Sequence, residues 1–201
     1  MSAADEPRWG REDDAAAAAD RLLDIAGDLF VTHGVTRVTV RDVALAAGCS
    51  RGTVHRYFAD RASLRQAYVE REAARVGAAV VEQLTSVDDP GERVLTAILS
   101  ALHEVRTRPV LVAWFDPAAA GTAAHLARAD RTIRVLVRAF LDSLVDDPGT
   151  RAELRPGLDL DLAADWIVRI VVSLLAEPGS STDAERRQLD QLLLPALLTT
   201  A

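Results

Sequence analysis

Residues 48–52 read Gly-Cys-Ser-Arg-Gly, a G-x-S-x-G pattern that in hydrolases marks the sharp turn presenting a nucleophilic serine. Such a turn requires a strand before the serine, and an acidic residue followed by a histidine further along the chain. The segment before Gly48 instead carries apolar residues at helical spacing: Val40, Val43, Ala44 and Ala47. A serine hydrolase that uses Ser50 is therefore a remote alternative, and we expect that this protein is not an enzyme.

The same segment fits two helices that meet at a tight turn and cross each other, with small or apolar residues where they touch. Small Ala44 allows the two helices to approach, and Gly48 supplies a left-handed backbone conformation that a side chain would resist. Cys49 is then expected to be a small buried apolar group rather than a reactive thiol. We therefore predict a helix-turn-helix whose second helix begins after Ser50 as its N-cap.

Charge is distributed unevenly along the chain, although the formal net charge is -7. Residues 1–30 hold eight acidic residues and three arginines, whereas residues 31–76 hold eight arginines and four acidic residues. The predicted helix-turn-helix lies inside this basic segment. Because the arginine guanidinium matches phosphate and guanine with two parallel hydrogen bonds, the segment favours a nucleic-acid partner despite the acidic total.

A single cysteine excludes a disulfide framework, and the first residues lack the apolar run of a signal peptide. The longest apolar stretch, residues 166–176, is interrupted by Arg169 and is shorter than the roughly 20 residues that a membrane-spanning helix needs. We expect a cytoplasmic protein with no membrane partner, no cofactor and no bound metal.

Apolar residues recur at three- and four-residue spacing through most of the chain, which predicts an all-α protein. We expect a flexible tail at 1–13, a helix-turn-helix domain at 14–60, and a helical ligand-binding and dimerisation domain at 61–201. Caps and glycine stops predict helices near 14–32, 39–48, 51–58, a long one after Asp60, and then 90–107, 109–115, 119–145 and 160–176. The last helix is predicted to start with a capping box of Thr182 and Glu185, and to kink or end at Pro195.

The run LLDIAGDLFVTHGVTRVTVRDVALAAGCSRGTVHRYFADRASLRQAY, residues 22–68, closely resembles the N-terminal signature of the TetR family of bacterial repressors. The resemblance implies a ligand-responsive transcriptional repressor that binds a palindromic operator in double-stranded DNA as a homodimer, and that a small, largely hydrophobic effector releases from DNA. A helical protein-interaction module that does not bind DNA is the alternative. Nothing in the sequence names the effector.

In a helix-turn-helix the first turn of the second helix meets base edges in the major groove, which here places Arg51, Gly52 and Thr53 against DNA. The resemblance adds backbone contacts at Thr39, Arg41 and Arg61, whereas His55 departs from the tyrosine that is common in relatives. The complete set of predicted DNA-binding residues is Thr39, Arg41, Ser50, Arg51, Gly52, Thr53, His55, Arg56, Tyr57 and Arg61.

The C-terminal domain is predicted to hold an effector pocket and a dimer interface. Candidate pocket residues are Leu102, His103, Trp114, Phe115, His125, Leu136 and Phe140. The helix at 160–176 carries apolar residues on more than one face, which predicts that a second copy covers one of them. Candidate interface residues are Leu162, Trp166, Ile170, Leu174, Leu189, Leu193 and Leu197.

Overall fold

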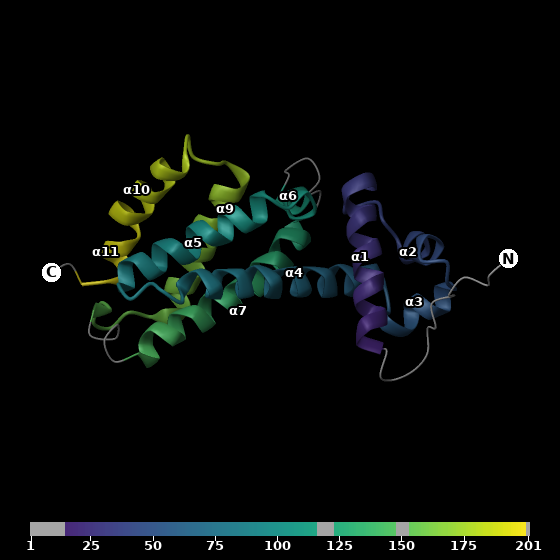
Figure 1. Cartoon of the computed structure of the whole chain (residues 1–201), viewed down its shortest axis with the longest axis horizontal. Helices are drawn as coiled ribbons and strands as arrows, with labels where there is room; N and C mark the ends of the chain where they lie inside the picture. Colours follow the sequence, from purple (N-terminus) through teal and green to yellow (C-terminus); the bar gives the residue numbers. More distant parts are fainter. Residues whose placement is uncertain (1–14, 116–122, 148–152, 200–201) are drawn as a thin grey trace. The chain divides into compact units, whose positions relative to one another are not determined.

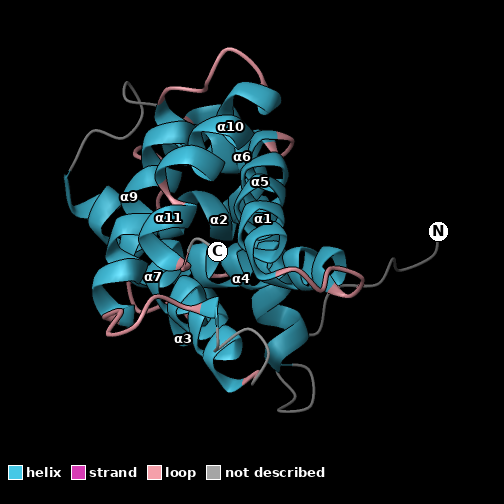
Figure 2. Ribbon diagram, turned by 90° about the vertical axis from the view of Figure 1, so that its left-hand side faces the viewer, coloured by secondary structure: helices cyan, strands magenta, loops and turns pink. Residues whose placement is uncertain are grey.

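The computed structural model describes residues 15–115, 123–147 and 153–199, and these residues fold into helices joined by turns. No strand occurs in these ranges, and Figure 2 shows the helical ribbons and their loops. The all-α prediction is confirmed. The predicted N-terminal tail lies outside the described residues. Among the described helices, none combines the length and the apolar character that crossing a membrane requires.

The chain divides into two compact units, residues 1–68 and 69–201, and the division falls inside one helix, α4 (Arg61–Leu84). The first unit contains α1 (Ala15–His33), α2 (Val40–Ala46), α3 (Arg51–Tyr57) and the first two turns of α4 (Figure 1). Phe30 of α1 packs edge-on against Tyr68 of α4, with ring centroids 5.2 Å apart. The core of this unit is built from Leu22, Ala26, Phe30, Val35, Val38, Val43, Ala44, Val54, Phe58 and Leu64.

Side-chain caps fix where the helices of the first unit begin. Thr39 and Asp42 form the predicted capping box of α2, because the Thr39 hydroxyl accepts from the Asp42 amide while Asp42 Oδ2 accepts from the Thr39 amide. Asp60 caps α4 in the same way, accepting from the Ser63 amide at 2.7 Å. Gly34 and Gly48 have φ of 82° and 63°, so both predicted helix stops adopt the left-handed conformation.

The second unit comprises the rest of α4 and the helices that follow it, with their bounds close to the predicted ones (Figure 1). These are α5 (Pro90–Arg106), α6 (Pro109–Phe115), α7 (Ala123–Asp146), α9 (Leu160–Ala176), α10 (Thr182–Leu192) and α11 (Leu194–Leu197). Pro195 lies in the first turn of α11, which follows the end of α10 at Leu192, as predicted for a proline that cannot continue a helix.

The core of the second unit includes four residues that the sequence assigned to a dimer interface. Leu174, Leu189, Leu193 and Leu197 are at most 7% exposed and pack with residues of α5 and α7 in one apolar cluster. That part of the prediction is wrong, because these side chains fill the interior of their own chain. The error came from counting apolar residues without knowing how many helices of the same chain surround α9 and α10.

The start of α10 also differs from its prediction. Ser181, not Thr182, is the N-cap, and its hydroxyl accepts from the Ala184 amide. Glu185 does not close a capping box, since its side chain turns inward and is 1% exposed. There its two oxygens accept from Arg106 at 2.7 and 2.8 Å, and Oε1 also accepts from the Gly179 amide.

The Glu185–Arg106 pair should be a major polar contribution to the stability of this unit. Glu185→Gln removes the negative charge and leaves the half-buried guanidinium without its ionic partner, so we expect the free energy of unfolding to fall by about 2 kcal/mol. Arg186→Gln breaks the exposed Arg186–Glu92 pair and serves as the control, with a loss under about 1 kcal/mol. Urea unfolding followed by circular dichroism measures both values. Equal losses would contradict the claim that the buried Glu185–Arg106 pair stabilises the protein more than the exposed pair does.

The same pair predicts a pH dependence. Hydrogen bonds from Arg106 hold the pKa of Glu185 below its ordinary value near 4.5. A lowered folded-state pKa stabilises the protein above the unfolded pKa, and that contribution disappears as the pH falls through the folded pKa. The stability difference between wild type and Glu185→Gln should therefore be constant near neutral pH and shrink below about pH 4.5.

Candidate functional site

The surface of α3 is the first candidate site, because a short helix in the basic segment presents most of its side chains to solvent. Val54 is fully buried and anchors the helix, while Arg51, Gly52 and Arg56 are exposed. Thr53, His55 and Tyr57 are half-buried. All ten residues predicted to contact DNA therefore keep some surface, and their contacts with DNA remain a prediction.

Ser50 caps α3, and this role accounts for its hydroxyl. Ser50 Oγ accepts from the Thr53 amide at 3.0 Å and lies 2.9 Å from the Thr53 hydroxyl. The element that precedes Ser50 is α2, a helix, so the strand that a nucleophile elbow requires is not there. The G-x-S-x-G pattern is therefore not a nucleophile elbow, since Gly48, Cys49 and Ser50 form the turn between α2 and α3 and Gly52 belongs to α3.

Arg51 is held in place by the residue one helical turn later. Its Nε donates to His55 Nε2 at 2.9 Å, and His55 Nδ1 lies 2.8 Å from the Ala59 carbonyl oxygen. Both bonds are satisfied together when the neutral imidazole carries its proton on Nδ1. His55 thus orients the arginine side chain through Nε, and the two terminal nitrogens of Arg51 have the fork geometry that matches guanine or phosphate.

Gly52 is not required by the fold of the protein. A Cβ at this position would meet Ser50 Oγ at 3.6 Å, which is ordinary van der Waals contact. The residue lies on the exposed face of α3 beside Arg51. Because glycine has no side chain, the backbone of a ligand can approach this face of the helix closely.

The residues expected to grip a nucleic-acid backbone lie at the starts of neighbouring helices. Arg41, in the first turn of α2, is exposed, and Asp42 beside it accepts hydrogen bonds from Thr39 that lower its pKa. Arg61 begins α4, and its Nε has no hydrogen-bond partner in the described part of the chain. Each of these positions places a cation at or next to a helix N-terminus, where amide groups and the helix dipole favour an anion.

Cys49 completes the turn as a partly buried residue. Burial raises the pKa of its thiol, so little reactive thiolate forms near neutral pH. This agrees with a packing role. Among the described side chains, no cluster of three or more His, Cys, Asp or Glu could hold a metal ion.

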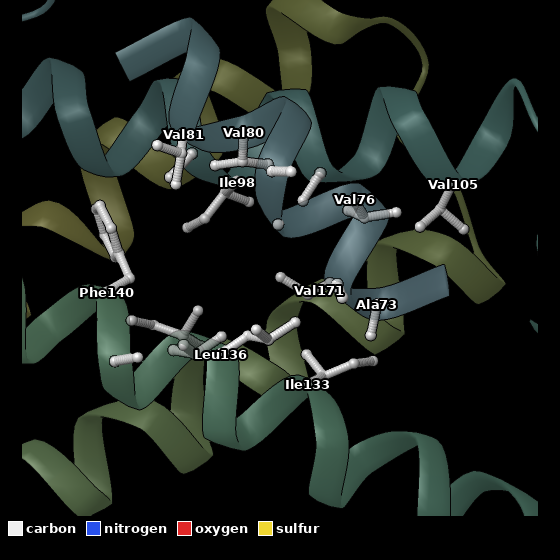
Figure 3. Close-up of a pocket in the computed structure, with 18 of the residues that line it drawn as sticks. Ala73, Val76, Val80, Val81, Ile98, Val105, Ile133, Leu136, Phe140 and Val171 are labelled. Atoms are coloured by element: carbon white, nitrogen blue, oxygen red, sulfur yellow. The ribbon is translucent and has the colours of Figure 1, made fainter. Parts of the chain in front are cut away.

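The second candidate site is a cavity of about 850 Å³ inside the second unit. Residues from α4, α5, α6, α7 and α9 line it, and nearly all of them are apolar. Figure 3 shows Val80 and Ile98 on one side of this space, facing Leu136 and Ile133 on the other. A cavity of this size and lining is typical of a site for a small apolar molecule.

Small side chains explain why the cavity exists. Several positions that face it carry alanine or glycine, whose side chains cannot span the distance between the helices: Ala73, Gly77, Ala97, Ala101 and Ala139. At Gly77 even an added Cβ would only reach ordinary contact with Leu136, at 3.6 Å. Protein interiors are otherwise packed as densely as organic crystals, so a void of this size needs such a row of small residues.

Two of the seven predicted pocket residues, Leu136 and Phe140, line this cavity. Leu102 does not, because it is 1% exposed and belongs to the core cluster, and His103 is exposed on the surface. The side chains of Trp114, Phe115 and His125 lie outside the described residues. Leu102 and His103 are therefore not part of this cavity, and their place in an effector pocket has no support from it.

Sequence reasoning missed the contribution of α4 to the cavity. Val69, Ala73, Val76, Val80 and Leu84 repeat at helical spacing and line it from one side. This stripe was visible in the sequence as an apolar face of the predicted long helix. What the sequence did not show is that the face borders a cavity instead of tight packing.

Comparisons with known proteins agree with this geometry. Residues 22–68 match the family described as "Bacterial regulatory proteins, tetR family". An uncharacterized HTH-type transcriptional regulator of Mycobacterium tuberculosis is 38% identical over 178 residues, which cover 89% of this chain and 84% of that protein. The HTH-type transcriptional repressor AcnR of Corynebacterium glutamicum is 25% identical over 201 residues and covers 94% of each protein.

The fold is similar to that of solved regulators. The crystal structure of RolR in complex with resorcinol aligns with a TM-score of 0.69 and 22% identity, covering 93% of this chain and 90% of RolR. At this identity the likeness concerns the fold alone.

Arg51→Ala should abolish tight, sequence-specific DNA binding, because one arginine fork on a base contributes roughly 1–3 kcal/mol of discrimination. We expect the Kd for a selected operator to rise roughly 5- to 150-fold, while binding to random duplex changes less. Fluorescence anisotropy with labelled DNA measures both. Arg187→Ala removes an exposed charge on α10 and is the control; a similar loss there would refute a specific role for Arg51.

His55→Ala should weaken operator binding through Arg51. Without its acceptor the arginine samples more rotamers, and we expect a loss of roughly three- to tenfold. The decisive measurement is the double variant Arg51→Ala/His55→Ala, which should bind no more weakly than Arg51→Ala alone. Additive losses would show instead that His55 acts independently of Arg51.

Proposed function

Because the chain belongs to the TetR family of bacterial transcriptional regulators, we propose that it is a repressor that binds a palindromic operator as a homodimer and leaves DNA when a hydrophobic effector enters its cavity. The DNA-binding element is the helix-turn-helix formed by α2 and α3. The observation that carries the proposal is the exposed first turn of α3, in which Arg51 is oriented by His55.

The dimensions of α3 support its insertion into the major groove. A helix with its side chains is about 10–12 Å across, and the major groove of B-DNA is about 12 Å wide. Ser50 fixes the start of the helix, and Phe58 fixes its end by donating its amide to the Val54 carbonyl. The helix therefore offers a fixed set of donors, so that little conformational entropy is lost on binding DNA.

A second copy of the chain is proposed to cover the exposed side of α9. Leu162 and Trp166 lie one turn apart and are 68% and 53% exposed, and Ile170 follows one turn later and is half-buried. Leu192 on α10 is 71% exposed. This revised interface retains three of the predicted residues and adds Leu192, because large apolar side chains at the surface favour burial against a partner.

The twofold symmetry of such a dimer predicts an inverted-repeat operator, with half-site centres about 34–36 Å apart in the simplest geometry. An effector that favours a different spacing of the two α3 helices would lower operator affinity by mass action. The helix α4 supports this coupling, because one continuous helix carries cavity-lining residues and also supplies Leu64 and Tyr68 to the core of the first unit.

Selection of genomic fragments by the purified protein, followed by footprinting, tests the DNA-binding proposal directly. We expect an enriched inverted repeat, protected on one face of the duplex, whose affinity falls by roughly 0.9 log units per tenfold salt for each phosphate contacted. Failure to enrich any inverted repeat at low ionic strength would favour the alternative, a helical protein-interaction module.

Trp166→Glu should shift the protein toward monomer, because it places a charge in the proposed apolar interface. Sedimentation velocity at micromolar concentration measures the change, and operator affinity should fall with it. Val112→Glu, at another exposed apolar residue of the second unit, is the matched control and should leave the dimer intact. A wild-type protein that sediments as a monomer would overturn the dimer proposal.

A further inference from the structure

The cavity has two chemically different ends, and the difference indicates the class of its ligand. Along α5 the lining runs from Arg93 to Val105, about 18 Å at 1.5 Å per residue. In Figure 3, Phe140 and Val81 lie toward one end, and Ala73 and Val105 toward the other. The space is therefore elongated, and the residues between its ends are apolar.

The end near Val105 holds a buried carboxylate that the protein already neutralises. Glu72 lines this end, is 4% exposed, and contacts the guanidinium groups of three arginines. Arg75 Nη1 donates to its Oε1 at 2.8 Å, while Arg71 Nε and Arg108 Nη1 lie 3.3 and 3.7 Å from its oxygens. Because this carboxylate is satisfied by the protein, it does not require a cationic ligand.

The end near Phe140 is open and carries a cation. Thr85 and Ser143 line it and are exposed, and Val81 beside them is 64% exposed. Arg93 also lines this end and is half-buried. Its Nη1 donates to the Val87 carbonyl at 3.0 Å, and the described residues provide no carboxylate partner for it.

Arg93 combines two features: it lines the cavity, and within the described part of the chain it lacks the carboxylate partner that many arginines of the second unit have. Six of them pair with an aspartate or glutamate at 3.0 Å or less: Arg75, Arg106, Arg108, Arg134, Arg138 and Arg186. In an acidic protein, a cation at the mouth of an apolar cavity without such a partner is best explained by an anion that arrives with a ligand.

We propose that the cavity binds a linear amphiphile with one alkyl chain and one free carboxylate, the carboxylate at Arg93 and the chain extending along α5 toward Glu72. The inference rests on the proposed function, because it takes the cavity as the effector site. A carboxylate at the mouth gains a charge-assisted hydrogen bond from Arg93 while it stays partly hydrated. The alkyl chain is buried among the apolar side chains of the helices that line the cavity.

Two series of compounds test this assignment: the saturated fatty acids from octanoic to hexadecanoic acid, and the 1-alkanols of equal length. Calorimetry with the full-length protein gives Kd for each. We expect affinity to rise by about fourfold per added methylene until the cavity is filled. At equal chain length the acid should bind roughly 10- to 100-fold more tightly than the alcohol.

The variant Arg93→Met keeps an unbranched side chain but replaces the cationic guanidinium with an apolar group. It should abolish the preference for acid over alcohol while the gain per methylene persists, and Arg93→Lys should restore part of the preference. Arg155→Met, at an exposed arginine outside the cavity lining, should behave as wild type. A melting temperature within a few degrees of wild type shows that each variant is folded.

Different results would overturn different parts of the argument. Equal binding of acid and alcohol by the wild-type protein, or a preference that survives in Arg93→Met, refutes the role of Arg93. Failure of every compound in both series to bind refutes the proposal that the cavity binds a linear amphiphile. Operator binding is also measured without ligand. Failure in that assay would contradict the proposed regulator function and not the proposed ligand.

Discussion

A helix of seven residues is not stable alone in water, and the presentation of α3 depends on what holds it in place. Val54 and Phe58 insert into the core of the first unit, and Ala44 is small enough for α2 to approach α3 closely. The turn between them closes because Gly48 adopts φ of 63° and the Cys49 amide donates to the Ala44 carbonyl. Buried contacts thus hold the helix in place, so its exposed residues are not needed for packing and can serve binding.

The two units use opposite packing solutions. In the first unit, large side chains such as Phe30 of α1 and Tyr68 of α4 meet in direct contact and fill the core. In the second unit, several alanines and Gly77 on α4, α5 and α7 line a cavity of about 850 Å³. A void of this kind lowers the stability of the protein relative to a filled core. A ligand that binds only the folded state would recover the lost stability.

Buried and exposed charged side chains also differ in whether the protein supplies them with partners. Glu185 and Glu72 are buried carboxylates, and each is surrounded by guanidinium groups or backbone amides that replace the water it lost. By contrast Arg41 and Arg51 stay exposed, and neither contacts a carboxylate in the described residues. The acidic total of the sequence therefore says little about binding, because many of the acidic residues are engaged within the protein, whereas these two arginines are available to an anion.

The sequence by itself determined the helix-turn-helix, nearly all helix ends, and the residues at the surface of α3. Caps such as Thr39 with Asp42, and the left-handed Gly48, act within three or four residues, so a local pattern is sufficient to predict them. The tertiary structure alone decided whether an apolar residue faces the core, the cavity or solvent. Leu189 and Leu192 look equivalent in sequence, yet they are 1% and 71% exposed, because that difference depends on helices distant in the chain. The inward turn of Glu185 depends likewise on Arg106, a partner 79 residues away that no local pattern could reveal.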